Sequence, residues 1–231
     1  MARITMPDNA RRAGVSTGAV SYALNDKPGV SEETRARVIG IAAELGWAPS
    51  SAARSLSGAR SEAVGLVLAR DPNLLGVESF YMQFLAGIET ELSKRSYALT
   101  LQVVPDLDAE LRTYRAWQAA RRVDGVIVVD PRSDAPRLDF FRGKDALCAV
   151  VVGDTSLASG LTNVWTDDAT AMRESVRYLY AMGHRRIARV GGVETFGHTL
   201  IRDRAFDEEI AALEAEGLSC TPTTRRCKGL A

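Results

Sequence analysis

Residues 10–25 read Ala10-Arg11-Arg12-Ala13-Gly14-Val15-Ser16-Thr17-Gly18-Ala19-Val20-Ser21-Tyr22-Ala23-Leu24-Asn25. This pattern predicts two short helices joined by a tight turn. Gly14 can adopt the left-handed conformation that such a turn requires, and small residues let the helices approach closely. Ala10 and Ala13 are the small residues at this contact, and Val15, Val20 and Leu24 are expected to form the shared core. The spacing therefore predicts a helix-turn-helix, a motif whose second helix enters the major groove of DNA.

Capping residues extend this prediction to three helices within residues 1–46. Thr5 can cap a first helix, with Asp8 three residues later, close to the spacing of a capping box. Ser16 can cap the second helix and Ser31 the third. An ordinary three-helix bundle with polar, solvated faces has the same spacing, so this alternative stays open on spacing alone.

The second predicted helix has a polar outer face. Because a recognition helix enters the major groove with its N-terminus first, we expect Thr17, Gly18 and Tyr22 to lie nearest the bases. Gly18 has no side chain, so it can only permit a close approach. Phosphate contacts are expected from Ser16, Ser21 and Asn25.

Beyond a small, polar linker over residues 47–60, apolar runs alternate with segments of helical spacing. Strands are expected over residues 63–69, 97–104, 123–129, 147–152 and 187–190, and helices over residues 80–94, 109–121, 170–181 and 199–216. This alternation is typical of parallel βαβ units, and fully apolar strands fit a sheet covered on both faces. Residues 218–231 show neither periodicity and are expected to form an irregular tail. The expected fold class is an all-α headpiece followed by an α/β domain.

The composition is that of a soluble globular protein with room for two bodies of unequal size. The chain has 231 residues, of which 46% are hydrophobic and 25% charged, and its net charge is zero. The charge is unevenly distributed: residues 1–60 carry eight basic and five acidic residues, so their net charge is +3 and that of the remainder is −3. A basic N-terminal module on an acidic body suits a polyanion partner for the module alone.

No segment predicts secretion, a membrane span, a metal or a cofactor. The N-terminus lacks an apolar signal core and no later stretch is long enough to cross a membrane, so we expect a cytoplasmic protein. Cys148 lies in an apolar run and is expected in the core. Neither Cys220 nor Cys227 has a CxxC partner, and neither His184 nor His198 has a second ligand beside it.

Two protein classes other than a DNA-binding regulator find less support in the sequence. An enzyme is not expected, because the turn Gly191–Gly197 fits neither G-x-G-x-x-G nor G-x-x-x-x-G-K-[ST], and no catalytic triad or carboxylate pair stands out. A transport-associated solute-binding protein would suit the α/β body. The N-terminal helices and the absence of a signal peptide argue against that class.

Residues 10–25 are followed by Gly29-Val30-Ser31, Thr34-Arg35 and Leu45-Gly46-Trp47-Ala48-Pro49. In order and spacing these motifs closely resemble the headpiece of the lactose-repressor (LacI-type) family over residues 1–58. Residues 61–217 resemble, more loosely, the periplasmic-binding-protein-like sensor domain of that family. The resemblance implies a sequence-specific transcription regulator, most simply a repressor that responds to a sugar-like effector and binds a near-palindromic operator of double-stranded DNA as a homodimer.

The resemblance also implies the domain organisation and the DNA contacts. The expected parts are a headpiece (1–46), a hinge helix or linker (47–60), a first sensor lobe (61–160), a partial second lobe (161–217) and the tail (218–231). The hinge helix would form on DNA, with Leu56 wedged into the minor groove beside the small residue Ala53. The expected DNA-contacting residues are Thr5, Ser16, Thr17, Gly18, Ser21, Tyr22, Asn25, Ser31, Ala53 and Leu56.

Three positions depart from the family pattern. Asn9 stands where an apolar residue is usual, and an unpaired amide in so small a core would cost ~1–3 kcal/mol. Ser50 stands where asparagine is usual. Tyr22 stands where some members carry a base-reading arginine, so their operator preference cannot be transferred to this chain.

Matching positions in the body suggest an effector site between two lobes. The expected residues are Phe80, Tyr81, Asp130, Asp154 and Arg202. Several of them follow the carboxyl ends of predicted strands, where open α/β sheets bind ligands. Carboxylates, an arginine and an aromatic ring suit a sugar-like, polyhydroxylated ligand. Helix N-caps for the two aspartates and a core position for Phe80 remain open as alternatives.

Members of the family continue beyond the point where this chain ends, so the resemblance implies an incomplete second lobe. We expect impaired effector binding, because one wall of the cleft would be incomplete. We also expect a partly unfolded second lobe, because sheet edges and apolar faces would lack cover. A natural short variant and a truncated or frameshifted product both fit. A fragment that binds DNA but lacks effector regulation therefore stays open as an alternative.

Overall fold

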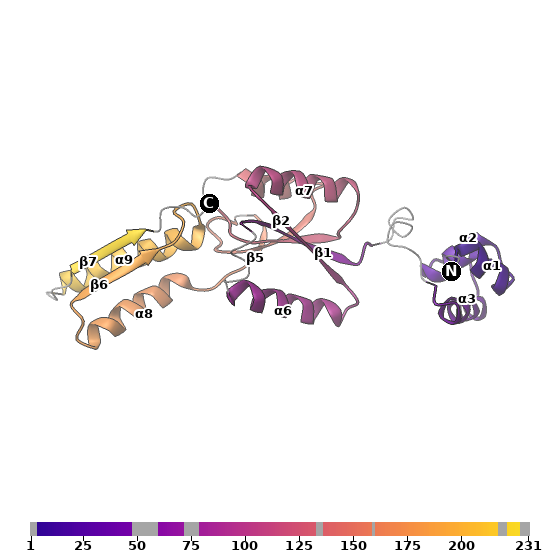
Figure 1. The fold of residues 1–231 in the computed structure, drawn as a ribbon, viewed down its shortest axis with the longest axis horizontal. Coiled ribbons are helices and arrows are strands. Elements are labelled where there is room, and N and C mark those ends of the chain that lie inside the picture. The colour runs from indigo at the N-terminus through magenta and orange to yellow at the C-terminus, as the bar shows by residue number, and fades with distance from the viewer. Residues whose placement is uncertain are drawn as a thin grey trace. The chain divides into compact units, whose positions relative to one another are not determined.

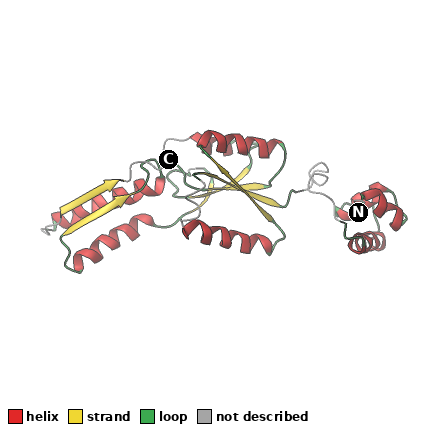
Figure 2. Cartoon of the chain, viewed as in Figure 1, coloured by secondary structure: helices red, strands yellow, loops and turns green. Residues whose placement is uncertain are grey.

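The computed structural model describes residues 4–47, 60–71, 79–132, 136–158, 160–216 and 221–226. The chain forms two compact units, Met1–Ser61 and Glu62–Ala231, of which the first is helical and the second contains both sheets (Figure 1, Figure 2). None of the helices in these ranges combines the length and the apolar character that a membrane crossing requires. Most of the predicted linker, residues 48–59, lies outside the described residues.

Three helices form the N-terminal unit: α1 (Met6–Ala13), α2 (Thr17–Leu24) and α3 (Glu32–Glu44). Their caps are those that the sequence predicts. The Asp8 carboxylate accepts hydrogen bonds from Thr5 Oγ1 (2.6 Å) and Thr5 N (3.0 Å), and these bonds lower the pKa of Asp8. Ser16 and Ser31 cap α2 and α3, each accepting a backbone N–H through its hydroxyl oxygen. Gly14 ends α1 at φ 68°, in the left-handed region.

The core of this unit is small and contains one polar side chain. Its buried apolar residues are Ala10, Ala13, Val20, Ala23 and Val38. Asn9 is also fully buried, on the inner side of α1, and neither its Nδ2 nor its Oδ1 has a hydrogen-bond partner among the described residues. The predicted departure at this position therefore places an unpaired amide in the core.

The second unit opens with a five-stranded parallel sheet. Its strands are β1 (Ala63–Ala69), β2 (Ala98–Val104), β3 (Gly125–Val128), β4 (Cys148–Val152) and β5 (Thr162–Val164), in the order β2-β1-β3-β4-β5. Helix α6 (Ser79–Ser93) covers one face and α7 (Leu107–Ala119) the other (Figure 1). A 3-10 helix, η1 (Pro136–Phe141), packs on the face that α7 covers. Neither β5 nor η1 was predicted from the sequence.

Alternate residues of β1 pack on opposite faces of this sheet. Leu68 is buried in one cluster with Tyr81 of α6, and Val67 in another with Trp117 of α7. Gly65 allows α7 to approach β1 closely, because a Cβ at this position would lie 2.4 Å from the Trp117 ring. The apolar run of β1 is thus explained by a strand that both helices cover.

The second lobe consists of α8 (Asp168–Ala181), β6 (Arg186–Gly191), α9 (Gly197–Ala215) and β7 (Thr221–Arg226). Strands β6 and β7 pair in parallel. The two helices share a buried cluster with β6 that consists of Val176, Ile187, Phe206, Ile210 and Leu213. Ion pairs also join the helices, among them Arg173–Glu208 and Arg202–Asp168, each at 2.8 Å.

Two predictions from the sequence are wrong. Residues 221–226 are a strand rather than part of an irregular tail. These residues form a strand because they pair with β6, and they have no apolar pattern of their own. Periodicity in the sequence therefore could not indicate this strand. Cys148 is exposed rather than buried in the core. It is the first residue of β4, and its neighbour in the register, Gly125, has no side chain to cover it.

Replacing Asn9 by leucine, which has a similar shape, should stabilise the N-terminal unit by about 1–2 kcal/mol, because an unpaired buried amide is removed. Native-state hydrogen exchange of the full chain should then show slower exchange in α1, α2 and α3. Exchange in β1, which belongs to the other unit, should not change and serves as the internal control. Equal or faster exchange in the three helices would contradict the account of Asn9.

Candidate functional site

The outer face of α2 is accessible. Ser16, Thr17 and Gly18 are exposed, and Tyr22 is 46% exposed. A Cβ added at Gly18 would meet only Ser16 Oγ, at 3.7 Å, so packing within the unit does not require glycine there. The missing side chain instead leaves the backbone open to close approach from outside.

The other predicted DNA-contacting residues already make local hydrogen bonds. Asn25 Nδ2 donates to Ser21 O at 2.8 Å and so caps the C-terminal end of α2. The hydroxyls of Thr5 and Ser31 take part in the caps of α1 and α3. The first turns of such helices keep backbone N–H groups that can bind phosphate. Outside the described residues lie Ala53 and Leu56.

A second group of polar residues lies at the carboxyl ends of β1 and β3. Asp130 follows β3, and its Oδ2 accepts hydrogen bonds from Arg70 Nη2 (2.6 Å), Arg70 Nε (3.2 Å) and Tyr81 Oη (2.6 Å). Arg70 follows β1, and Tyr81 comes from the buried side of α6. Asp130 has φ 50°, a conformation that non-glycine residues seldom adopt and that often marks a functional position.

Phe196, the N-cap residue of α9, packs against this group. The guanidinium of Arg70 lies 5.5 Å from the Phe196 ring centroid, and that of Arg132 lies 5.4 Å from it. Arg132 and Phe196 also form an antiparallel β-bridge, and Gly197 N donates to Pro131 O at 2.9 Å. These contacts join the two lobes beside the sheet.

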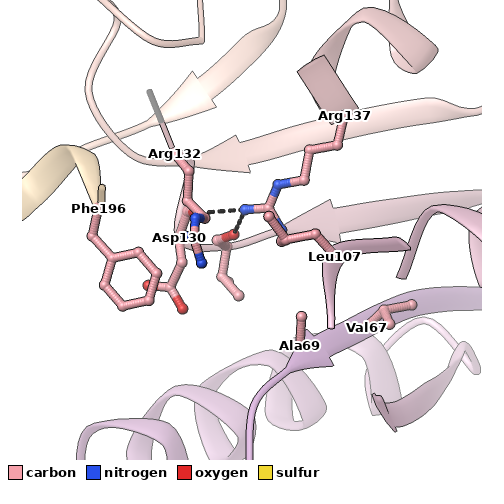
Figure 3. Close-up of a pocket in the computed structure, with 8 residues that line it drawn as sticks. Val67, Ala69, Leu107, Asp130, Arg132, Arg137 and Phe196 are labelled. Carbon is pink, nitrogen blue, oxygen red and sulfur yellow. Dashed lines mark hydrogen bonds between the residues drawn. The ribbon is translucent and has the colours of Figure 1, made fainter. Parts of the chain in front are cut away.

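A small, partly open pocket lies at this junction (Figure 3). It is lined by Val67, Ala69, Leu107, Val129, Asp130, Arg132, Arg137 and Phe196. The lining combines an apolar floor from β1 with a carboxylate, two guanidinium groups and an aromatic ring. This combination can accept hydroxyl protons, donate to ligand oxygens and cover an apolar ring face.

Arg137 holds the backbone beneath Asp130. Its guanidinium donates to the carbonyl oxygens of Val129 (2.5 Å) and Asp130 (Figure 3), and it pairs with Glu110. Tyr114 Oη donates to Glu110 Oε1 at 2.9 Å. Burial raises the pKa of Glu110, although the charge of Arg137 opposes this effect. The network thus supports Asp130 in its uncommon backbone conformation.

The structure brings two of the five residues predicted for the effector site together, Tyr81 and Asp130. Phe80 is 61% exposed on α6. Asp154 Oδ1 accepts the backbone N–H of Ser156 in the turn over residues 155–157, so this contact is not the helix N-cap named as its alternative. Arg202 pairs with a carboxylate at the start of α8. None of these last three residues lines the pocket described above.

Several residues of this group were not predicted from the sequence: Arg70, Arg132, Arg137 and Phe196. Arg70 could have been found, because it directly follows a predicted strand, as Asp130 does. Arg137 and Phe196 join the site only through η1 and the second lobe, which no local pattern indicates. His198 is half-buried in α9, where burial lowers its pKa while Asp130 acts in the opposite direction.

His198 should make the free energy of unfolding depend on pH. Because its pKa in the folded chain lies below the ordinary value of 6.5, the unfolded chain binds more protons at pH values below 6.5. The free energy of unfolding should therefore rise as pH increases through the lowered pKa and level off above 6.5. Urea denaturation from about pH 5 to about pH 8 should show a smaller rise for His198→Gln.

His184→Gln is the matched control, because His184 is exposed and is the other histidine of the chain. This variant should keep the pH dependence of the unmodified chain. An equal pH dependence in His198→Gln and in the unmodified chain would contradict the assignment to His198.

Two family models match most of the chain. "Bacterial regulatory proteins, lacI family" matches residues 5–50, the region of the three helices. "Periplasmic binding proteins and sugar binding domain of LacI family" matches residues 61–219, the region of the α/β unit. The two matched regions together hold α2 and the pocket-lining residues.

Individual transcription regulators are also similar to this chain in sequence. The HTH-type transcriptional regulator AglR of Rhizobium meliloti (strain 1021) is 29% identical over 218 residues, which are 94% of this chain and 59% of the relative. The ribose operon repressor of Escherichia coli (strain K12) is 29% identical over 194 residues, 81% of this chain and 56% of the relative. The chain thus spans less than two thirds of the length of these relatives.

Among solved structures, a LacI family transcriptional regulator from Bifidobacterium animalis subsp. lactis is 29% identical, with a TM-score of 0.62 over 73% of this chain and 58% of the other. The likeness thus holds in sequence and in fold. Since the two family models cover both units, the chain belongs to the LacI family of bacterial regulatory proteins.

Proposed function

We propose that this chain is a sequence-specific DNA-binding transcription regulator, a repressor that responds to a small sugar-like effector. The observation that carries the proposal is the accessible polar face of α2 within the residues that match the lacI-family model. A relative named as an operon repressor supports repression as the output. The chain acts by binding rather than by catalysis, on DNA in the cytoplasm.

In this proposal α2 enters the major groove, where Thr17 and Tyr22 contact base edges and Gly18 allows the close approach. Phosphates bind the exposed N-terminal turns of the helices. Two copies of the chain bind a near-palindromic operator as a homodimer, because a two-fold symmetric protein reads two symmetric half-sites. Leu56 and Ala53 contact the minor groove from the hinge.

The effector binds at the pocket beside Asp130. Since Arg70 and Tyr81 hold Oδ2 of this carboxylate, we assign its Oδ1 to a ligand hydroxyl. The Phe196 ring covers the apolar face of a sugar ring. The family model that spans this unit names a sugar-binding domain, and a relative is named for the ribose operon.

Operator selection from random DNA tests the reading face. The unmodified chain should select one sequence, and Tyr22→Ala and Thr17→Ala should each relax the base preference at different positions of it. Each lost base contact should cost about 1–3 kcal/mol of discrimination. Tyr178→Ala, at a tyrosine that is 66% exposed in the other unit, is the control and should select the original sequence. Unchanged preferences in both α2 variants would show that another surface reads the DNA.

Thermal unfolding with a panel of mono- and disaccharides tests the effector site. At least one sugar should raise the melting temperature of the full chain, by an amount equivalent to about 2.7 kcal/mol at a hundred times its Kd. Asp130→Asn should abolish the shift, whereas Asp139→Asn, at an exposed position of η1, should keep it.

The sugar that raises the melting temperature should also weaken binding to the selected operator. An equal shift in Asp130→Asn would refute the role of Asp130. DNA binding that no sugar changes would favour the alternative of a fragment without effector regulation.

A further inference from the structure

Helix α2 has only eight residues, and two of them, Val20 and Ala23, are buried. Contacts that precede the helix hold its N-terminal end. Val15 N donates to Ala10 O at 3.1 Å, and Ser16 Oγ accepts from Ala19 N at 3.1 Å. The first turn, which carries Thr17 and Gly18, is therefore held from the side of α1.

The C-terminal end of α2 is held from α3. Arg35 reaches back from the first turns of α3, and its Nη1 donates to Ala23 O at 3.2 Å. Its Nη2 donates to Lys27 O, in the turn after the helix, at 3.1 Å. One guanidinium group thus connects the last turn of α2 and the following turn to α3. A cation at this end also interacts favourably with the helix dipole.

Arg35 also forms ion pairs with two exposed carboxylates. Its side chain is only 14% exposed, and Nη1 lies 2.6 Å from Asp26 Oδ1. Nε lies 3.6 Å from Glu32 Oε2, on the same helix as Arg35. Asp26 has φ 50°, so the turn that this network spans contains a non-glycine residue in the left-handed region. The planar guanidinium presents several donors in a fixed geometry, which the compact ammonium of lysine does not.

We propose that Arg35 is a positioning residue for sequence recognition. It fixes the C-terminal half of α2, and with it Tyr22, relative to α3, and it acts through the helix rather than on the DNA. Thr17, at the other end of α2, does not depend on it. This role rests on the proposed function, in which α2 reads DNA. It goes beyond that function because Arg35 should affect base reading by Tyr22 and not by Thr17.

The test compares Arg35→Met and Arg35→Lys with the unmodified chain. Arg37→Met is the matched control, because it removes the same charge from an exposed position of the same helix. The probes are a duplex with the sequence that the unmodified chain selects and a scrambled duplex. Arg35→Met should bind the selected duplex about tenfold more weakly, which corresponds to about 1.4 kcal/mol. The affinity of Arg35→Lys should lie between those of Arg35→Met and the unmodified chain. Arg37→Met should not lose discrimination between the duplexes.

Two further readouts separate positioning from other roles. In operator selection, Arg35→Met should relax the preference only at the bases that Tyr22→Ala affects, and not at those that Thr17→Ala affects. The dependence of affinity on salt should keep its slope, because no phosphate contact is lost.

Three results would overturn the proposal: an unchanged selection profile, a loss of preference at all positions alike, and a salt slope smaller by about one, which would make Arg35 a phosphate contact. Hydrogen exchange in α1 monitors folding of the variants. If both Arg35 variants unfold the N-terminal unit, Arg35 serves folding and the positioning role is refuted. A failure of the proposed function is distinguishable, because the unmodified chain would then select no sequence at all.

Discussion

A helix of eight residues is not stable in water by itself, since isolated helices shorter than about 12–15 residues are marginal. Helix α2 has this length, so its structure depends on contacts from outside. Ser16 caps its first turn, Val20 buries its inner side, and Arg35 holds its last turn. Because these contacts take up the inner side and both ends, the outer face is left to a partner.

In the second unit, too, neighbouring residues hold the groups that face the cleft. Asp130 stands at the carboxyl end of a central parallel strand, where the fold itself leaves a crevice. Its side chain is held by Arg70 and Tyr81, and its backbone by Arg137. Both sites therefore present a few polar groups whose positions are set by buried or half-buried neighbours.

Local chemistry made part of this structure predictable. The caps Thr5, Ser16 and Ser31 and the left-handed Gly14 act within a few residues of themselves, so the sequence pattern was sufficient. Long-range partners were not predictable from such patterns. Strand β7 exists because it pairs with β6, and Arg70, Arg137 and Phe196 meet only after the sheet, η1 and α9 have formed. Asp130 and Tyr81 were found because they match family positions, and not because the spacing required them.

The proposed function requires that the outer face of α2 reads DNA. Its most direct test is to titrate the full, isotopically labelled chain with the duplex it selects and to follow the backbone amide signals by NMR. The largest changes in chemical shift should fall at Ser16, Thr17, Gly18 and Tyr22, and the strands of the second unit should change little. Changes centred on another surface, with the signals of α2 unmoved, would contradict the proposed function.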